Sequence, residues 1–98
     1  MSTPDIRSFL IDDTNERKFN RNHVYAHQVE QILENRHLVV PNRRNRRGAF
    51  LIIGLDHGGK CISVPVEATN DPTIWRPVTA WPSKGYEEAK LKQKGGKL

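Results

Sequence analysis

The sequence contains a single cysteine, and this scarcity excludes several classes of protein. Cys61 has no second cysteine to pair with, so the fold holds no internal disulfide. One cysteine and four scattered histidines also lack the short, regular ligand spacing of a zinc site. We therefore expect neither a metal nor any other cofactor.

Long apolar runs are missing as well. No stretch approaches the roughly 20 apolar residues that span a bilayer, and no basic amphipathic helix is visible that would lie on its surface. The first ten residues, MSTPDIRSFL, do not combine a basic start with an apolar run, so no signal peptide is expected. The sequence predicts a cytoplasmic protein without a membrane partner.

Positive charge is what the sequence has in excess. Lysine and arginine number 16 against 11 aspartates and glutamates, which gives a formal net charge of +5. Acidic residues gather near the start, whereas residues 41–50 read PNRRNRRGAF, with four arginines in five residues. Such separation of charge favours an anionic partner.

Helices are expected in the first third of the chain. Residues 6–11 have the composition of a short β-strand. Asp13 followed by Glu16 resembles a capping box, which predicts a surface helix over 13–21. Apolar residues then recur at steps of three and four, which predicts a second helix within 24–35.

Strands dominate the rest of the chain, at 37–40, 48–55, 61–67 and 74–80. The segment 48–55 is nearly all apolar, as in a central strand covered on both faces. The segment 61–67 alternates in polarity, which predicts a half-buried strand. The turn DHGG between them makes the two antiparallel. Ser83 is expected to cap a last helix.

The predicted fold is therefore α+β, an antiparallel β-meander with two N-terminal helices and a C-terminal helix. With 98 residues the chain has the size of one domain, 1–98. We expect flexible ends at 1–5 and 95–98.

The arginine cluster forms the connection between two expected strands, and two interpretations stay open. It is either a solvated hairpin tip that discourages aggregation, or an anion-binding loop. Arginine presents a planar fork that matches phosphate oxygens, which favours nucleic acid as the anion. The expected RNA-binding residues are the four arginines and the histidine of the following turn: Arg43, Arg44, Arg46, Arg47 and His57. The spacing of the aromatic residues does not bring them together, so packing roles are expected for them.

Three segments together resemble the BrnT-like toxins: FLIDDTNERKFNRNHVYAHQVEQILEN, FLIIGLDHGGKCISVPVE and WRPVTA. The resemblance runs from about Phe9 to Leu91. It rests on the order of an Asp and an Asn opening the first helix (Asp12, Asn15), a Gly ending the long strand (Gly54), the pair Gly59-Lys60, and Thr79-Ala80 followed by a helix glutamate. The family consists of small ribonucleases of type II toxin–antitoxin systems with a RelE-like fold.

The chain also departs from the family pattern at three places. Asn22-His23-Val24 stands where the family has His-Gly-Val, Trp81 stands where it usually has arginine, and Leu91 where a tyrosine is common. The last two departures leave an alternative open: a non-catalytic module on the same fold that binds nucleic acid or an antitoxin.

The resemblance implies the toxin of a toxin–antitoxin pair, a metal-independent endoribonuclease that cleaves mRNA and inhibits growth. Its partners would be RNA and a small DNA-binding antitoxin, with ribosome association left open. Such an enzyme needs proton-transferring groups and fixed cations around the reacting phosphate. The expected catalytic residues are Arg47, Lys60, Arg76 and Glu87. For Arg76 a salt bridge to Glu67 or Asp71 is an equally good interpretation.

Overall fold

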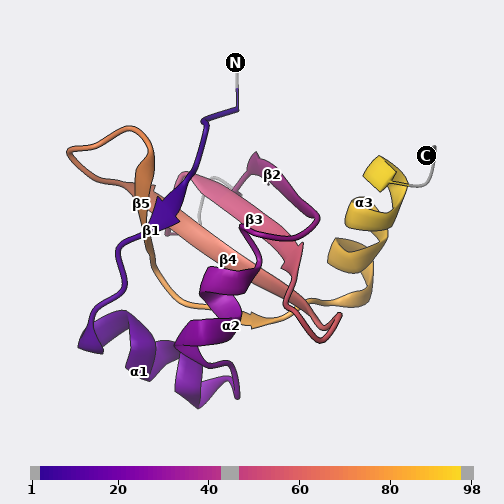
Figure 1. Cartoon of the computed structure of the whole chain (residues 1–98), viewed down its shortest axis with the longest axis horizontal. Helices are drawn as coiled ribbons and strands as arrows, with labels where there is room; N and C mark the ends of the chain where they lie inside the picture. Colours follow the sequence, from indigo (N-terminus) through magenta and orange to yellow (C-terminus); the bar gives the residue numbers. More distant parts are fainter. Residues whose placement is uncertain (1–2, 43–46, 96–98) are drawn as a thin grey trace.

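The computed structural model describes residues 3–42 and 47–95. In this part of the chain three helices accompany a six-stranded sheet, a mixed α+β domain (Figure 1). The elements in order are β1 (Ser8–Phe9), α1 (Asp13–Arg21), α2 (Ala26–Gln31), β2 (His37–Pro41), β3 (Phe50–Leu55), β4 (Cys61–Ala68), β5 (Ile74–Pro77), β6 (Trp81–Pro82) and α3 (Gly85–Gly95). The expectations for residues 1–2 and 96–98 lie outside the described residues. None of the described helices has the length and apolar character that a membrane span requires.

The sheet has the strand order β1-β5-β4-β3-β2, and β6 pairs separately with β4. From β2 to β5 the neighbours are antiparallel, which confirms the predicted meander. The expected first strand shrinks to Ser8–Phe9, which joins β5 in parallel.

The expected strand 74–80 ends at Pro77 as β5, β6 follows beyond it at Trp81–Pro82, and Pro65 of β4 accounts for the break between them. Its carbonyl accepts a hydrogen bond from the backbone N–H of Val78 at 2.8 Å, but proline has no N–H to donate in return. The ladder beside β4 is therefore interrupted between the two short strands.

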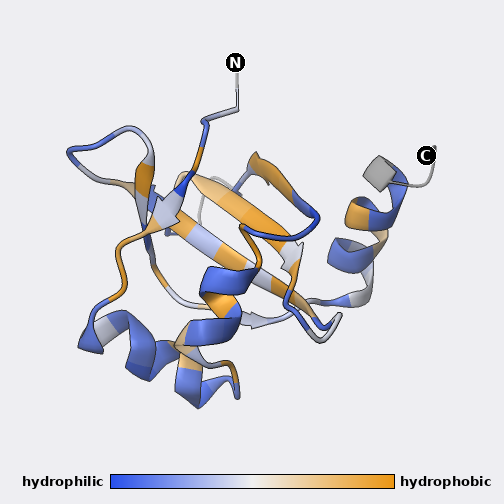
Figure 2. Cartoon of the chain, in the orientation of Figure 1, coloured by the Kyte–Doolittle hydropathy of each residue, from blue (hydrophilic) through white to orange (hydrophobic). Residues whose placement is uncertain are grey.

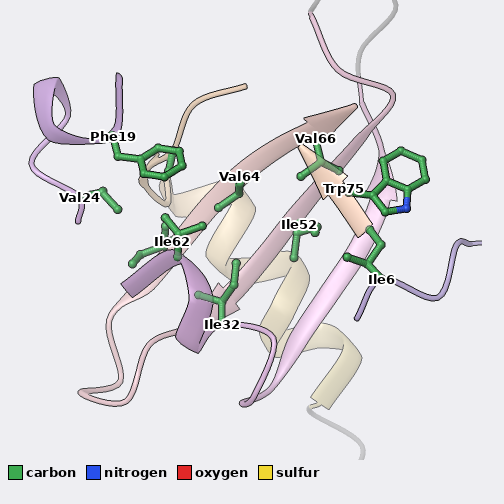
Figure 3. Close-up of a cluster of buried hydrophobic side chains, with 11 residues drawn as sticks. Ile6, Phe19, Val24, Ile32, Ile52, Ile62, Val64, Val66 and Trp75 are labelled. Carbon is green, nitrogen blue, oxygen red and sulfur yellow. The ribbon is translucent and has the colours of Figure 1, made fainter. Parts of the chain in front are cut away.

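One face of the sheet carries the main hydrophobic core. Ile52, Ile62 and Val64 are fully buried there against α1 and α2, with Phe19 inserted from α1 and Trp75 from β5 (Figure 3). Figure 2 shows the corresponding pattern, with apolar residues along β3 and β4 and polar residues over the outer sides of the helices. Because Phe19 has no exposed surface, α1 is anchored in the core, although it carries few apolar residues.

The opposite face of the sheet is partly covered by α3. Ile53 and Cys61 of this face pack with Leu91 of the helix, which is 2% exposed. The prediction of a half-buried strand at 61–67 is therefore wrong: residues 61–66 are buried on both faces. The alternation of polarity in β4 misleads because Ser63 points into a polar contact under α3.

The first helix spans 13–21 as predicted, but its N-cap lies one residue earlier than predicted. Asp12, not Asp13, is the N-cap, and its side chain accepts a hydrogen bond from the backbone N–H of Asn15 at 2.9 Å. The Asn15 side chain accepts from the N–H of Asp12 in return, which completes a capping box. The predicted box of Asp13 and Glu16 is therefore wrong.

The second helix is shorter than expected, and the third begins later than its predicted cap at Ser83 implies. After Gln31 the chain continues in turns whose hydrogen bonds span three residues, so α2 ends before Asn35. The Asn35 amide instead donates to the carbonyl of Gln31. The last helix begins at Gly85, because Ser83 is engaged with Ser63 across the sheet.

The junction between α1 and α2 forces His23 into the left-handed region, with φ of +63°. Neighbouring Asn22 donates from its side chain to the carbonyl of Ala80 at 2.9 Å, and Val24 is fully buried, so the junction is held on both sides. A side chain with a Cβ is strained in this conformation, whereas glycine is not.

We expect His23→Gly to stabilise the protein. Removing the Cβ relieves the left-handed strain, and the greater entropy of glycine in the unfolded chain offsets part of the gain, which leaves about 0.5–1 kcal/mol. Urea denaturation measures this free energy of unfolding. The control His27→Gly, at an exposed position inside α2, should lower stability by about 1 kcal/mol. A destabilised His23→Gly variant would contradict the strain.

Gly54 of β3 lies close to Ile32, the residue that follows α2, and to His37 of β2. A Cβ at this position would lie 2.9 Å from the Cβ atoms of both Ile32 and His37. Gly54→Ala should therefore destabilise the protein by about 1–3 kcal/mol, because the core has to shift to admit the methyl group. Gly85→Ala is the matched control, since a Cβ there meets no atom within 4 Å. Thermal denaturation of the two variants compares them; equal stabilities would contradict the close approach.

Candidate functional site

A cleft of about 540 Å³ opens beside α3 on the partly covered face of the sheet. Its floor is apolar and consists of side chains from β2, β3, β4 and the segment after β5: Val40, Leu51, Pro65 and Val78. The first three are neighbours in the strand register, so they form a continuous row across the sheet.

Cationic and aromatic side chains surround this apolar floor. Arg47 lines the cleft from the β2–β3 connection, and Lys84 and Lys90 line it from the start of α3 and its second turn. Trp81 and Tyr86 also line it, the latter with 50% of its surface exposed. Three cations face a single carboxylate among the described lining residues, so the cleft favours an anionic ligand.

Glu87, the carboxylate of the cleft, is 3% exposed and connects three elements. Its Oε1 accepts hydrogen bonds from Ser63 Oγ of β4 at 2.9 Å, Trp81 Nε1 of β6 at 3.0 Å and the backbone N–H of Lys84 at 2.8 Å. The Oγ atoms of Ser63 and Ser83 lie 2.8 Å apart, which extends the network. The carboxylate therefore fixes both the indole ring and the start of α3.

Local sequence explains why Glu87 occupies this place. It lies three residues after Lys84, the residue before the helix, so its bond to that N–H is one half of a capping box. Ser63 and Trp81 are direct partners in the β4–β6 register, so their side chains point to the same face of the sheet. A buried carboxylate needs such hydrogen bonds to offset its lost hydration.

The arginine cluster is described only in part. Arg43, Arg44 and Arg46 lie outside the described residues. The residues on either side of them, Asn42 and Arg47, both line the cleft. Arg47 is mainly exposed, and its Nη2 lies 3.3 Å from Oε1 of Glu67.

Lys60 and His57 lie away from the cleft, at the turn between β3 and β4. The backbone N–H of Lys60 donates to Asp56 Oδ1 at 2.8 Å, and His57 Nδ1 is 3.0 Å from the Asn35 amide. Because β4 runs from this turn towards Arg47, a strand rise of about 3.3 Å per residue separates Lys60 from Arg47 by roughly 20 Å. These two predicted site residues therefore do not join the others.

Arg76 is engaged elsewhere, since its Nη1 donates to Asp12 Oδ2, not to Glu67 or Asp71. The backbone N–H of Asn15, and after it the Arg76 guanidinium, lowers the pKa of Asp12. This contact ties β5 to the cap of α1 and does not line the cleft.

The sequence did not predict a site role for the other cationic and aromatic residues of the cleft: Trp81, Lys84, Tyr86 and Lys90. A signal for two of them is present, because Lys84, Glu87 and Lys90 recur every three residues and so share one helix face. Trp81 donates to Glu87, and Leu91 of α3 packs against Ile53 and Cys61 of the sheet; these are the positions at which the BrnT-like toxins, which the sequence resembles, usually have an arginine and a tyrosine.

The described residues contain neither a reactive cysteine nor a cluster of metal ligands. Burial raises the pKa of the Cys61 thiol, which keeps it protonated and unreactive at neutral pH. Within residues 3–42 and 47–95, no three histidine, cysteine, aspartate or glutamate side chains gather as a metal would require.

Comparison with known proteins identifies no relative: neither a protein-family model nor a curated protein matches the chain. The BrnT-like family and the RelE-like fold therefore stay predictions.

Glu87→Ala should destabilise the protein by about 2–4 kcal/mol, because it leaves the buried Ser63 hydroxyl, the Trp81 indole N–H and the Lys84 N–H without their acceptor. Glu87→Gln retains an acceptor oxygen and should destabilise the protein less than Glu87→Ala. Glu88→Ala, one residue further along the helix, is the control and should change stability by about 0.5 kcal/mol or less. Equal effects of Glu87→Ala and Glu88→Ala in urea denaturation would contradict the network.

Proposed function

We propose that the cleft binds RNA and that the protein is a metal-independent endoribonuclease, the toxin of a type II toxin–antitoxin pair with the BrnT-like, RelE-like fold. The observation that carries the proposal is the convergence of Arg47, Lys84 and Lys90 on one cleft that also holds Tyr86. The resemblance in sequence supplies the reaction class, and the cleft supplies a place for it.

Binding of a phosphate group at Arg47 requires little rearrangement. Its bond to Glu67 is a surface ion pair, with side chains 64% and 33% exposed. Such pairs contribute only about 0–1 kcal/mol, so a phosphate with two or three acceptor oxygens competes well for the guanidinium. Lys84 directly precedes α3 and Lys90 lies on it, so the cations reach an RNA backbone from two different parts of the fold.

The proposed cleavage follows from these groups. The RNA 2′-oxygen loses its proton to a solvent water and attacks the adjacent phosphorus, and the bond from phosphorus to the 5′-oxygen breaks. The products are a 2′,3′-cyclic phosphate and a 5′-hydroxyl end. The three cations stabilise the charge that gathers on the phosphate oxygens. Tyr86 offers a hydroxyl that can donate a proton to the departing 5′-oxygen, while Glu87 positions the cleft wall.

A non-catalytic function is the second candidate, and a specific observation favours it. No histidine lines the cleft among the described residues, and the positions of the family's arginine and tyrosine hold Trp81 and Leu91 in structural contacts. In this alternative the same cations bind RNA without cutting it, or bind an acidic segment of the antitoxin.

The proposal predicts RNA cleavage that persists in EDTA and yields 2′,3′-cyclic phosphate ends. Arg47→Ala and Lys90→Ala should each weaken RNA binding roughly 10-fold, since one charge-assisted contact contributes about 1.5 kcal/mol. Arg17→Ala, on the exposed side of α1, is the matched control and should behave as wild type. Gel analysis of RNA ends, with and without ribosomes, measures cleavage. RNA bound but left uncut in both conditions supports the second candidate, and equal binding by all variants would contradict the cleft as the site.

A further inference from the structure

We infer that the cleft accepts one unpaired nucleobase on its apolar floor, beside the indole of Trp81, so that the substrate class is single-stranded RNA. This inference rests on the proposed function and deepens it. It concerns how the cleft selects RNA, not whether RNA is cleaved.

The apolar floor is the first argument. A site for phosphate alone needs cations and N–H donors, and an apolar surface would give it nothing. Here Val40, Leu51 and Pro65 form a row that is bordered by the cations. An unpaired base has an apolar face that gains from leaving water, and its sugar and phosphates remain at the charged rim.

The fixed indole is the second argument. The Trp81 ring lines the cleft, and its N–H is held by Glu87 at 3.0 Å, so its orientation is set before any ligand binds. A pre-organised aromatic surface contributes about 1–3 kcal/mol per stacked base. Tyr86, half exposed at the same cleft, offers a second aromatic ring.

Size and charge agree with this occupant. A volume of about 540 Å³ lies in the range of small-molecule sites, which suits one nucleotide and excludes a paired helix. Arg47 lies at the β2–β3 connection, whereas Lys84 and Lys90 lie just before and on α3, so the phosphates on the two sides of the base each have a cation near them. A base pair would have to open before either base could enter.

Tryptophan fluorescence provides the test. The protein has two tryptophans, and Trp75 lies in the core at 8% exposure, with its N–H bonded to Pro72 (Figure 3). Stacking with a base should therefore quench Trp81 alone. The ligand is a 2′-O-methyl RNA of about 12 nucleotides, which the 2′-hydroxyl mechanism cannot cleave. The protein is titrated in separate experiments with this single strand, with its duplex and with a mononucleotide.

The inference predicts saturable quenching by the single strand in the wild type and none in Trp81→Phe, which keeps Trp75 as an internal reference. Trp81→Leu should weaken binding of the single strand by at least about 5-fold. The duplex should bind about 10-fold more weakly than the single strand at equal salt. If the Trp81→Leu protein does not fold, the titrations of the wild type with single strand and duplex still test the inference.

The contrary results are distinct. Equal binding of single strand and duplex without quenching overturns base insertion and leaves RNA binding intact. Equal affinity for the mononucleotide and the oligonucleotide overturns RNA as the substrate class and indicates a free-nucleotide site. Absence of any binding overturns the proposed function together with the inference.

Discussion

The site depends on one buried carboxylate. Glu87 carries a hydrogen-bond acceptor into a nearly solvent-free position, where an unpaired charge would cost several kcal/mol. Its Oε1 meets donors from β4, β6 and the residue that precedes α3. These three bonds set the position of α3 over the sheet. The wall of the cleft, its indole ring and its lysines all follow from that position.

The cleft exists because the two faces of the sheet are covered unequally. The face under α1 and α2 holds the main core, with Ile52, Ile62 and Val64 fully buried. Among the described elements α3 alone packs on the other face, where Leu91 contacts Ile53 and Cys61. Beyond the reach of this helix Val40 of β2 and Leu51 of β3 stay partly exposed in the cleft, next to the buried Pro65 of β4. A short chain buries a limited share of its surface, and here the uncovered share is bordered by cations.

Local patterns in the sequence predicted most helices and strands well, but they did not predict which side chains contact one another. The antiparallel pair around the DHGG turn followed from the turn residues, and the central place of β3 followed from its apolar composition, although only three of its six residues are buried. The predicted N-cap of α1 was one residue too late. Asp12 and Asp13 are chemically alike, and only the reciprocal hydrogen bonds between Asp12 and Asn15 distinguish them. The buried side of β4 at Ser63 was hidden, since its polar partner Glu87 is 24 residues away.

The site could be predicted only in part, because it also depends on contacts between residues that are far apart in the sequence. Arg47 and Glu87 were expected at the site, and both line the cleft. Arg76 forms its ion pair with Asp12, 64 residues distant, and Lys60 lies at the far end of β4. The lysines of α3 join the cleft because a tertiary contact places the helix, and no local spacing encodes that contact.

The central claim is that RNA occupies the cleft between the sheet and α3. Amide and indole ¹⁵N–¹H spectra, recorded while a non-cleavable single-stranded RNA is added, test it most directly. The account predicts that shifts concentrate on the indole N–H of Trp81 and on backbone amides around Arg47 and Tyr86, while the Trp75 indole stays in place. Shifts gathered on α1 and α2, or spread evenly over the surface, would contradict it.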